Sequence, residues 1–222
     1  MALLGSAAIA MWWDVAPAHR AEFEDWHSHE HFPERLRIPG FLRGSRWSSA
    51  TENEGFFVIY ELDAYDTLTS AHYLERLNNP TPWSVKMMPH HRNMVRSQCR
   101  IMDSYGGGIT GSLVTVRLSP ETDQADAIRG ALQNVLGKIP NKVGLTSGHL
   151  LRTQTPRAAQ TKEQQIRGGT DAVADWIVLA FGYDARALED LSSGELASTS
   201  LGISGARHGF YRLAYAMTPR DL

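Results

Sequence analysis

The sequence predicts an α+β fold in which two tandem ferredoxin-like βαββαβ repeats pack sheet to sheet, as an α/β barrel within one chain. Strand-like and helical runs alternate in the order β-α-β-β-α-β, and the same order recurs after the stretch SYGGG at 104–108, which is interpreted as a flexible link. A single unit leaves one sheet face uncovered, so packing two units together buries it. We expect the first repeat at 1–105, carrying the active site, and a mainly structural second repeat at 109–222.

The first half begins with a buried strand, and Pro17 opens a helix that carries Phe23 and Trp26 on one side. Two β-rich runs around the polar turn TENEG predict a hairpin. A segment with three prolines, PTPWSVKMMPHHRN, predicts an irregular or short-helical excursion before the last strand. In chain order the predicted elements are a strand at 7–15, a helix from 17, strands at 40–50 and 56–64, a helix at 65–77 and a strand at 94–102.

The second half repeats this order with fewer polar features. Its first helix has acids at its start and an apolar stripe that includes Ile128 and Leu132, but no histidine. A plain structural helix suffices there, so we expect chemistry mainly in the first half. The predicted elements are a strand at 111–120, a helix at 121–139, a strand at 143–153, a polar loop at 154–171, a strand and helix at 175–191 and a strand at 209–217.

Composition excludes several classes of protein. The chain has 222 residues, 42% of them hydrophobic and 21% charged, with a formal charge of −2. It has no basic footprint for nucleic acid or anionic membranes, and no apolar run approaches the ~18 residues that span a bilayer. The single cysteine, Cys99, excludes an intrachain disulfide and a thiolate-rich metal site. The apolar start of the chain lacks a basic region and is interpreted as the first strand, and a reducing cytoplasm fits best.

The stretch DWHSHEHFPERLRIPGF, residues 25–41, is the main candidate for chemistry. On a helix His27 and His31 share a face, whereas His29 points the other way. Pro33 predicts that the helix ends or kinks near residue 32, which puts His31 at a helix C-terminus. There the helix dipole favours a protonated imidazole, with a pKa near or above neutrality. Such a histidine suits a general acid, or a cation facing a carboxylate substrate.

Two other interpretations of this stretch stay open. In a metal site, His27 and His31 are two ligands, and Glu30, Glu34 or His90 adds a third. The H-E-x-x-H pattern of zinc proteases is absent, because the residue three after Glu30 is a proline. In the plainest interpretation the histidines are a solvated helix end. We favour acid–base or anion-binding histidines, and predict no metal and no cofactor.

A second cluster, KMMPHHRN, places His90 and His91 beside Arg92. Adjacent residues point in different directions, so only one of the two histidines enters a pocket. A tight loop of Pro, His and Arg at a barrel mouth suits an anionic small molecule. A polar turn over the second helix is the alternative.

The segments FEDWHSHEHFPERLRIPGFLRGSRW and NNPTPWSVKMMPHHRNMVR resemble small dimeric α/β-barrel proteins of the EthD-like group, over residues 5–102. The resemblance implies a pocket between the helices and the sheet, with His31 as the family histidine and Glu30 and Glu34 as its flanking acids. This chain departs from the pattern in Phe32, where an aliphatic residue is more usual. The superfamily includes polyketide cyclases, muconolactone isomerases, monooxygenases without a cofactor and haem enzymes.

The leading hypothesis is a cofactor-independent enzyme that isomerises, cyclises or hydrolyses a small carboxylated, unsaturated or aromatic-derived metabolite. A non-catalytic small-molecule-binding barrel and a metal- or haem-dependent enzyme are the alternatives. The expected partner is a small-molecule substrate, and a homodimer is possible. The candidate catalytic residues are His31, His29 and His90. The candidate substrate-binding residues are Arg43, Arg92, His27, Glu34, Trp47, His72 and Tyr73.

Overall fold

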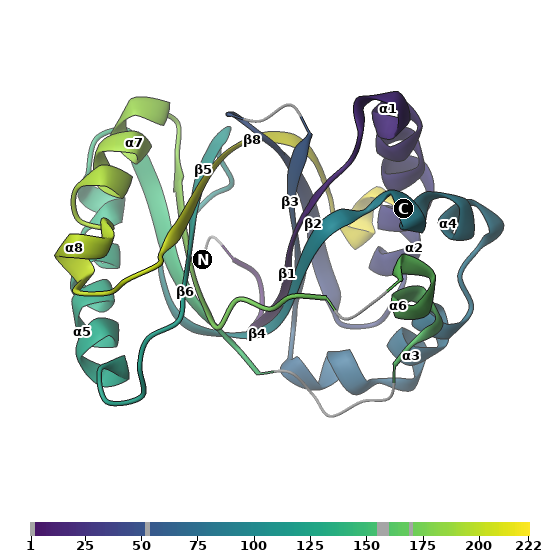
Figure 1. Ribbon diagram of the computed structural model, residues 1–222, viewed down its shortest axis with the longest axis horizontal. Coiled ribbons are helices and arrows are strands. Elements are labelled where there is room, and N and C mark those ends of the chain that lie inside the picture. The colour runs from purple at the N-terminus through teal and green to yellow at the C-terminus, as the bar shows by residue number, and fades with distance from the viewer. Residues whose placement is uncertain (1–2, 52–53, 155–159, 169–170) are drawn as a thin grey trace.

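The computed structural model describes residues 3–51, 54–154, 160–168 and 171–222. Within these ranges, eight strands form one closed barrel (Figure 1). Hydrogen bonding joins them in the order β1-β3-β2-β8-β5-β7-β6-β4, so the first four strands and the last four have the same internal arrangement. The halves meet where β2 pairs with β8 and β4 with β6. The strands are β1 (Ala7–Asp14), β2 (Phe41–Ser49), β3 (Gly55–Leu62), β4 (Arg92–Gly106), β5 (Ser112–Leu118), β6 (Leu145–Thr153), β7 (Trp176–Gly182) and β8 (Arg207–Met217). The predicted α+β barrel is confirmed.

Helices cover both outer sides of the barrel (Figure 1). One group covers the sheet of the first half: α1 (Pro17–Trp26), a π-helical turn (His27–His31), α2 (Phe32–Leu36), a 3-10 turn (Tyr65–Thr69), α3 (Ala71–Asn78), α4 (Pro82–Met87), a second 3-10 turn (Met88–His90) and α6 (Lys162–Arg167). The other covers the second half: α5 (Ala125–Leu136), a 3-10 turn (Ile139–Asn141), α7 (Ala185–Ser193) and α8 (Ser198–Leu201), and a last 3-10 turn (Pro219–Asp221) follows β8. None of the helices in the described ranges has the length and apolarity to cross a membrane.

The apolar core has three parts, because each sheet buries both faces. One cluster fills the space between the first sheet and its helices and includes the fully buried Phe23 and Trp26. A second lies under α5 and α7. The third fills the inside of the barrel, where Trp47 and Phe181 pack with ring centroids 5.5 Å apart. Alternate residues of each strand supply opposite faces, which is why the strands are almost continuously apolar.

Two loop predictions are wrong. The stretch predicted as a flexible link at 104–108 is strand as far as Gly106, because β4 continues along β6 and pairs Ser104 with His149. The loop predicted at 154–171 contains α6, which begins with a capping box between Thr161 and Gln164. Residues 155–159 and 169–170 of that loop lie outside the described residues.

The sequence predicts that the helix of the histidine stretch ends or kinks near residue 32, and the structure shows that it does not end there. It changes to a π-helical turn at His27–His31 and continues as α2 to Leu36. The amide of Phe32 donates to the carbonyl of His27, five residues back, which widens the turn just ahead of the proline. Single π turns inside α-helices occur frequently at functional sites. His31 therefore lies within a continuous helical segment and not at a free C-terminus.

Gly44 of β2 allows this segment to approach the sheet. A Cβ atom at this position would lie 2.2 Å from Cε1 of Phe32, a ring that packs against His27 with centroids 4.6 Å apart. We expect Gly44→Ala to lower the free energy of unfolding by about 1–3 kcal/mol, the usual cost of overpacking a core. Urea denaturation would measure it. Gly130→Ala is the control, because nothing lies within 4 Å of the added methyl group, and equal effects of the two substitutions would contradict the prediction.

Candidate functional site

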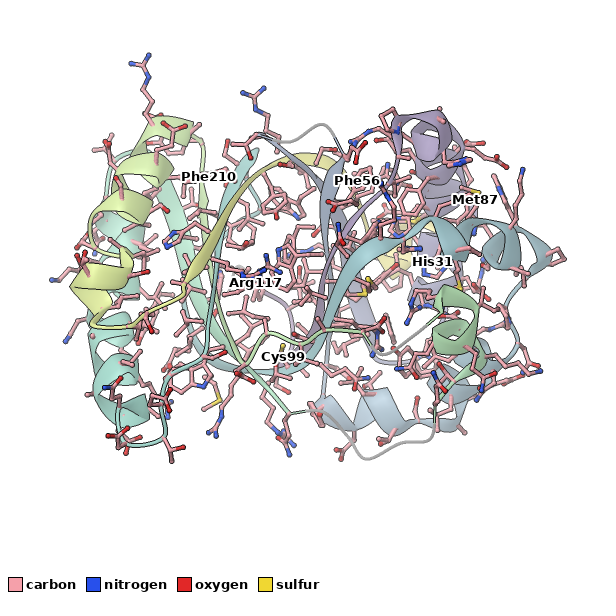
Figure 2. The ribbon with its side chains drawn as sticks, viewed as in Figure 1. His31, Phe56, Met87, Cys99, Arg117 and Phe210 are labelled. Atoms are coloured by element: carbon pink, nitrogen blue, oxygen red, sulfur yellow. The ribbon has the colours of Figure 1, made fainter. Side chains whose placement is uncertain are left out.

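A pocket with a volume of about 40 Å³ lies between the first sheet and the α1–α2 segment. Figure 2 shows His31 on this side of the molecule, between the strands and α6. The sheet contributes residues of β1, β3 and β4, and α6 closes the opposite side. The aromatic and apolar lining residues are Ile9, Met11, Trp13, Trp26, Tyr60, Tyr73, Leu77, Met88 and Met94. The histidines and charged residues are His27, His31, His91, Arg35, Arg96, Glu163 and Arg167.

His27 and His31 point into the pocket together, as the spacing predicts. Their rings stack with centroids 5.3 Å apart at an interplanar angle of 24°. Nδ1 of each ring is buried and has no hydrogen-bond partner in the described part of the chain. Burial lowers the pKa of both rings well below the ordinary value, and the nearby charge of Arg46 lowers the pKa of His27 further, as that of Arg35 does for His31. The expectation that a helix dipole keeps the pKa of His31 near or above neutrality is therefore wrong, because desolvation is the larger effect.

His91 completes a group of three neutral imidazoles. Its Nδ1 lies 2.9 Å from the carbonyl oxygen of Met88, which fixes the tautomer with the proton on Nδ1 and leaves a lone pair on Nε2. Burial lowers the pKa of His91 to about 3. The ring packs against Trp13, with centroids 4.9 Å apart. At neutral pH this ring is a proton acceptor or a metal ligand and not an acid.

The cations that line the pocket already have partners. Arg35 and Glu163 form an ion pair whose side chains are 4% and 5% exposed, respectively. Arg167 donates from Nη2 to a carboxylate oxygen of Asp171 at 2.9 Å. Arg96 donates to the hydroxyl of Tyr73 at 2.6 Å. The charges of Arg35 and Arg167 are thus compensated by carboxylates, whereas Arg96 contacts a neutral hydroxyl in the described part of the chain.

Of the residues selected from the sequence, His27, His31 and Tyr73 line this pocket. His29 lies on the opposite face with its side chain 73% exposed, and its Nδ1 contacts the carboxylate of Asp25 at 2.7 Å. His90 lies outside and stacks on His19 with centroids 3.7 Å apart. The exposed position of His29 follows from helical geometry, because it lies two residues from both His27 and His31.

The remaining selected residues also lie outside the pocket. Arg43 holds the carboxylate of Glu61 with two hydrogen bonds, of 2.7 and 2.9 Å. Arg92 pairs with Glu54 at the surface. His72 is exposed on α3, Trp47 is buried inside the barrel, and the buried Glu34 faces Arg76 at 3.6 Å.

Sequence reasoning missed the residues that reach the pocket from a distance along the chain. Glu163 and Arg167 come from the second half, on α6. The only local signal for α6 was the T-x-x-Q pattern at Thr161–Gln164, a capping box. Of the two adjacent histidines at 90 and 91, His90 is the one predicted from the sequence to be catalytic, whereas His91 lines the pocket.

No protein-family model and no curated protein sequence matches the chain. Solved structures share its fold at low identity. A proposed monooxygenase from Fusobacterium nucleatum subsp. nucleatum has 7% identity and a TM-score of 0.62, covering 96% of this chain and 95% of that one. An anthrone oxidase-like protein has 12% identity and a TM-score of 0.63, covering 96% and 93%. A proposed chlorite dismutase has 11% identity and a TM-score of 0.55, covering 96% of each chain. The chain is thus similar in fold to ferredoxin-like proteins of the dimeric α/β-barrel type.

Proposed function

We propose that the chain is an oxidoreductase whose redox group, a haem or a transition-metal ion, is bound through a histidine of the first-half pocket. One observation carries the proposal: the pocket gathers three neutral imidazoles, and that of His91 presents Nε2 while its Nδ1 donates to a backbone carbonyl. This is the usual state of a metal-ligating histidine, whose second nitrogen is oriented by an acceptor. The names of the structures that share the fold agree with oxygen chemistry.

The leading hypothesis from the sequence, cofactor-independent acid–base chemistry on a carboxylated metabolite, is wrong. Several solved structures that share the fold are named as proposed monooxygenases, an anthrone oxidase-like protein and a proposed chlorite dismutase, which points to redox chemistry. The pocket agrees with this correction. The proposed carboxylate anchors Arg43 and Arg92 are bound to Glu61 and Glu54. Burial holds the pKa of His31 well below its ordinary value, so at neutral pH its ring lacks the charge and the acidic proton of an imidazolium.

The donor chemistry of the pocket fits iron held by one protein ligand better than a bare ion. Haem iron can be held by one histidine of the protein, and His91 would be that residue. Within the described ranges no three His, Cys, Asp or Glu side chains form a group that could hold a metal ion. The sulfur atoms of Met88 and Met94, together with the indoles of Trp13 and Trp26, give the surroundings the apolar character that a haem pocket needs.

The closed pocket does not have room for a haem. Its volume of about 40 Å³ accommodates an ion or a few water molecules, whereas pockets for organic cofactors have ~300–1,000 Å³. Haem binding therefore requires the pocket to widen, and α6 is the short element that closes it opposite the sheet.

Titration of the purified protein with hemin and, separately, with ferrous iron tests the proposal. We expect a saturable absorption change at one equivalent of hemin, and binding at least about tenfold weaker in His91→Ala, a loss of ~1.4 kcal/mol. His29→Ala is the matched control, because that histidine lies on the exposed face. If neither hemin nor iron binds stoichiometrically, or if both variants bind like the wild type, the proposal fails.

Resemblance to the EthD-like group rests on the segment around His31, and a homodimer and a cytoplasmic location stay predictions from the sequence. The monooxygenase type of reaction is favoured over the chlorite dismutase type, because apolar and aromatic side chains dominate the pocket lining and would suit a small aromatic substrate once the pocket has widened.

A further inference from the structure

A second cavity, of about 310 Å³, lies at one end of the barrel and shares no lining residue with the histidine pocket. Strand β4 separates the two: Met94 and Arg96 face the histidine pocket, while Val95 between them lines the second cavity. Its other walls come from the end of β5, the start of β8 and residues 172–174. Figure 2 shows Arg117 within the barrel, well apart from His31.

Two arginines, Arg117 of β5 and Arg207 of β8, lie side by side in this cavity. They are directly opposite each other in the antiparallel register, an arrangement that is unfavourable for like charges. Arg117 is partly buried, with its guanidinium carbon 4.9 Å above the ring of Trp12. Burial lowers the pKa of Arg117, and Arg207 adds to the effect.

Neither arginine has a carboxylate or another hydrogen-bond acceptor as partner within the ranges that the structure describes. Other partly buried arginines do: Arg35 pairs with Glu163, and Arg43 with Glu61. Two adjacent guanidinium groups at a cavity, one of them partly desolvated, favour a bound anion. The planar guanidinium fork matches the two oxygens of a carboxylate.

The rest of the cavity decides which anion it suits. Val95, Leu118, Val173 and Ala174 form an apolar wall. A bare inorganic anion would leave this wall in contact with water, whereas an organic carboxylate covers it with its apolar body. A cavity of about 310 Å³ is at the lower end of the ~300–1,000 Å³ range of small-molecule sites.

We propose that this cavity binds a small organic carboxylate, with its oxygens on Arg117 and Arg207 and its apolar body against the wall formed by Val95 and Val173. The site is independent of the proposed redox function, because it lies on the other face of β4. It is the only part of this chain to which we assign carboxylate recognition.

Binding of benzoate, hexanoate, inorganic phosphate and the uncharged benzamide, measured by calorimetry and by thermal shift, tests the assignment. We expect saturable binding of benzoate or hexanoate, with phosphate and benzamide at least about tenfold weaker, the equivalent of ~1.4 kcal/mol. Arg117→Gln and Arg207→Gln should weaken carboxylate binding by at least a similar factor. Arg207 is exposed, so its variant is expected to fold even if Arg117→Gln does not.

Two controls separate this site from other effects. Arg186→Gln removes an exposed arginine of the same half and should leave binding unchanged. His91→Ala alters the histidine pocket and should also leave it unchanged. Equal binding of benzoate and benzamide, tighter binding of phosphate, or carboxylate affinity that survives Arg207→Gln would each overturn the proposal. Loss of binding in His91→Ala would assign the carboxylate to the other pocket and overturn it as well.

Discussion

Glu163→Gln is expected to lower the free energy of unfolding by about 3–5 kcal/mol, the usual cost of removing one partner of a buried ion pair. The carboxylate of Glu163 faces Arg35, and both side chains are at most 5% exposed. Glutamine keeps the size but not the charge, so the buried guanidinium of Arg35 loses its ion-pair partner and keeps only the weaker attraction of Glu34. Nη1 of Arg35 already has no hydrogen-bond partner within the described ranges, which leaves little to compensate the loss.

Urea denaturation at pH 7.5 measures this effect, and Glu195→Gln is the matched control. Glu195 pairs with Lys142 at the surface, with side chains 40% and 35% exposed, so we expect a change of about 0–1 kcal/mol. The double variant Arg35→Met with Glu163→Gln should recover part of the loss, because it removes the unpaired charge. A small effect of Glu163→Gln, equal to that of the control, would contradict the importance of the pair.

The pair also explains how the two halves cooperate at one site. Glu163 lies on α6, in the connection between β6 and β7 of the second half, whereas Arg35 lies on α2 of the first half. Helix α6 packs beside α3 and closes the histidine pocket (Figure 1). A pocket built within one half is thus covered by the other, and a helix of six residues has little stability without such tertiary contacts.

The fold could be predicted because its signals are local. Each strand is a short β-rich run bounded by turn residues, and each long helix has an apolar stripe, so the order of elements is readable without any distant contact. The closure of the barrel followed from the need to cover the second face of each sheet. Strand ends were less predictable: β4 runs on to Gly106 because it pairs with β6, a partner more than forty residues later.

The site was only partly predictable, because three of its features depend on context. The shared face of His27 and His31 follows from helical spacing, and the structure confirms it. The π turn that carries the helix past Pro33 could not be predicted from a rule for α-helices. The choice between His90 and His91 depends on the phase of a 3-10 turn, and the arrival of Glu163 depends on the tertiary path of a polar connection.

The free energy of unfolding is also expected to fall steeply as the pH drops below about 6.5, in protein without added haem or iron. His91 and His149 have folded-state pKa values of about 3, which burial lowers from the ordinary value near 6.5. Between these two pKa values the unfolded chain binds a proton that the folded chain excludes, so stability rises with pH. The full contribution is present above pH 6.5 and is lost progressively as the pH falls towards 3.

Each of these groups contributes about 1.4 kcal/mol per pH unit within this window. At pH 5.0 the loss is therefore about 2 kcal/mol for each, or about 4 kcal/mol for the pair. Burial raises the pKa of Glu34 and Glu61 and acts in the opposite direction at lower pH, so the comparison is best made between variants. We expect His91→Gln and His149→Gln each to reduce the difference in unfolding free energy between pH 7.5 and 5.0 by about 2 kcal/mol.

His29→Gln provides the reference, because that imidazole is largely exposed and should leave the difference unchanged. An equal pH dependence in wild type and His91→Gln would mean that the pocket accepts a charged imidazole. It would then be suited to an acid, and a neutral ring that presents Nε2 to iron would lose its physical basis. The pH dependence of stability therefore tests, without any substrate or cofactor, the protonation state on which the proposed redox site depends.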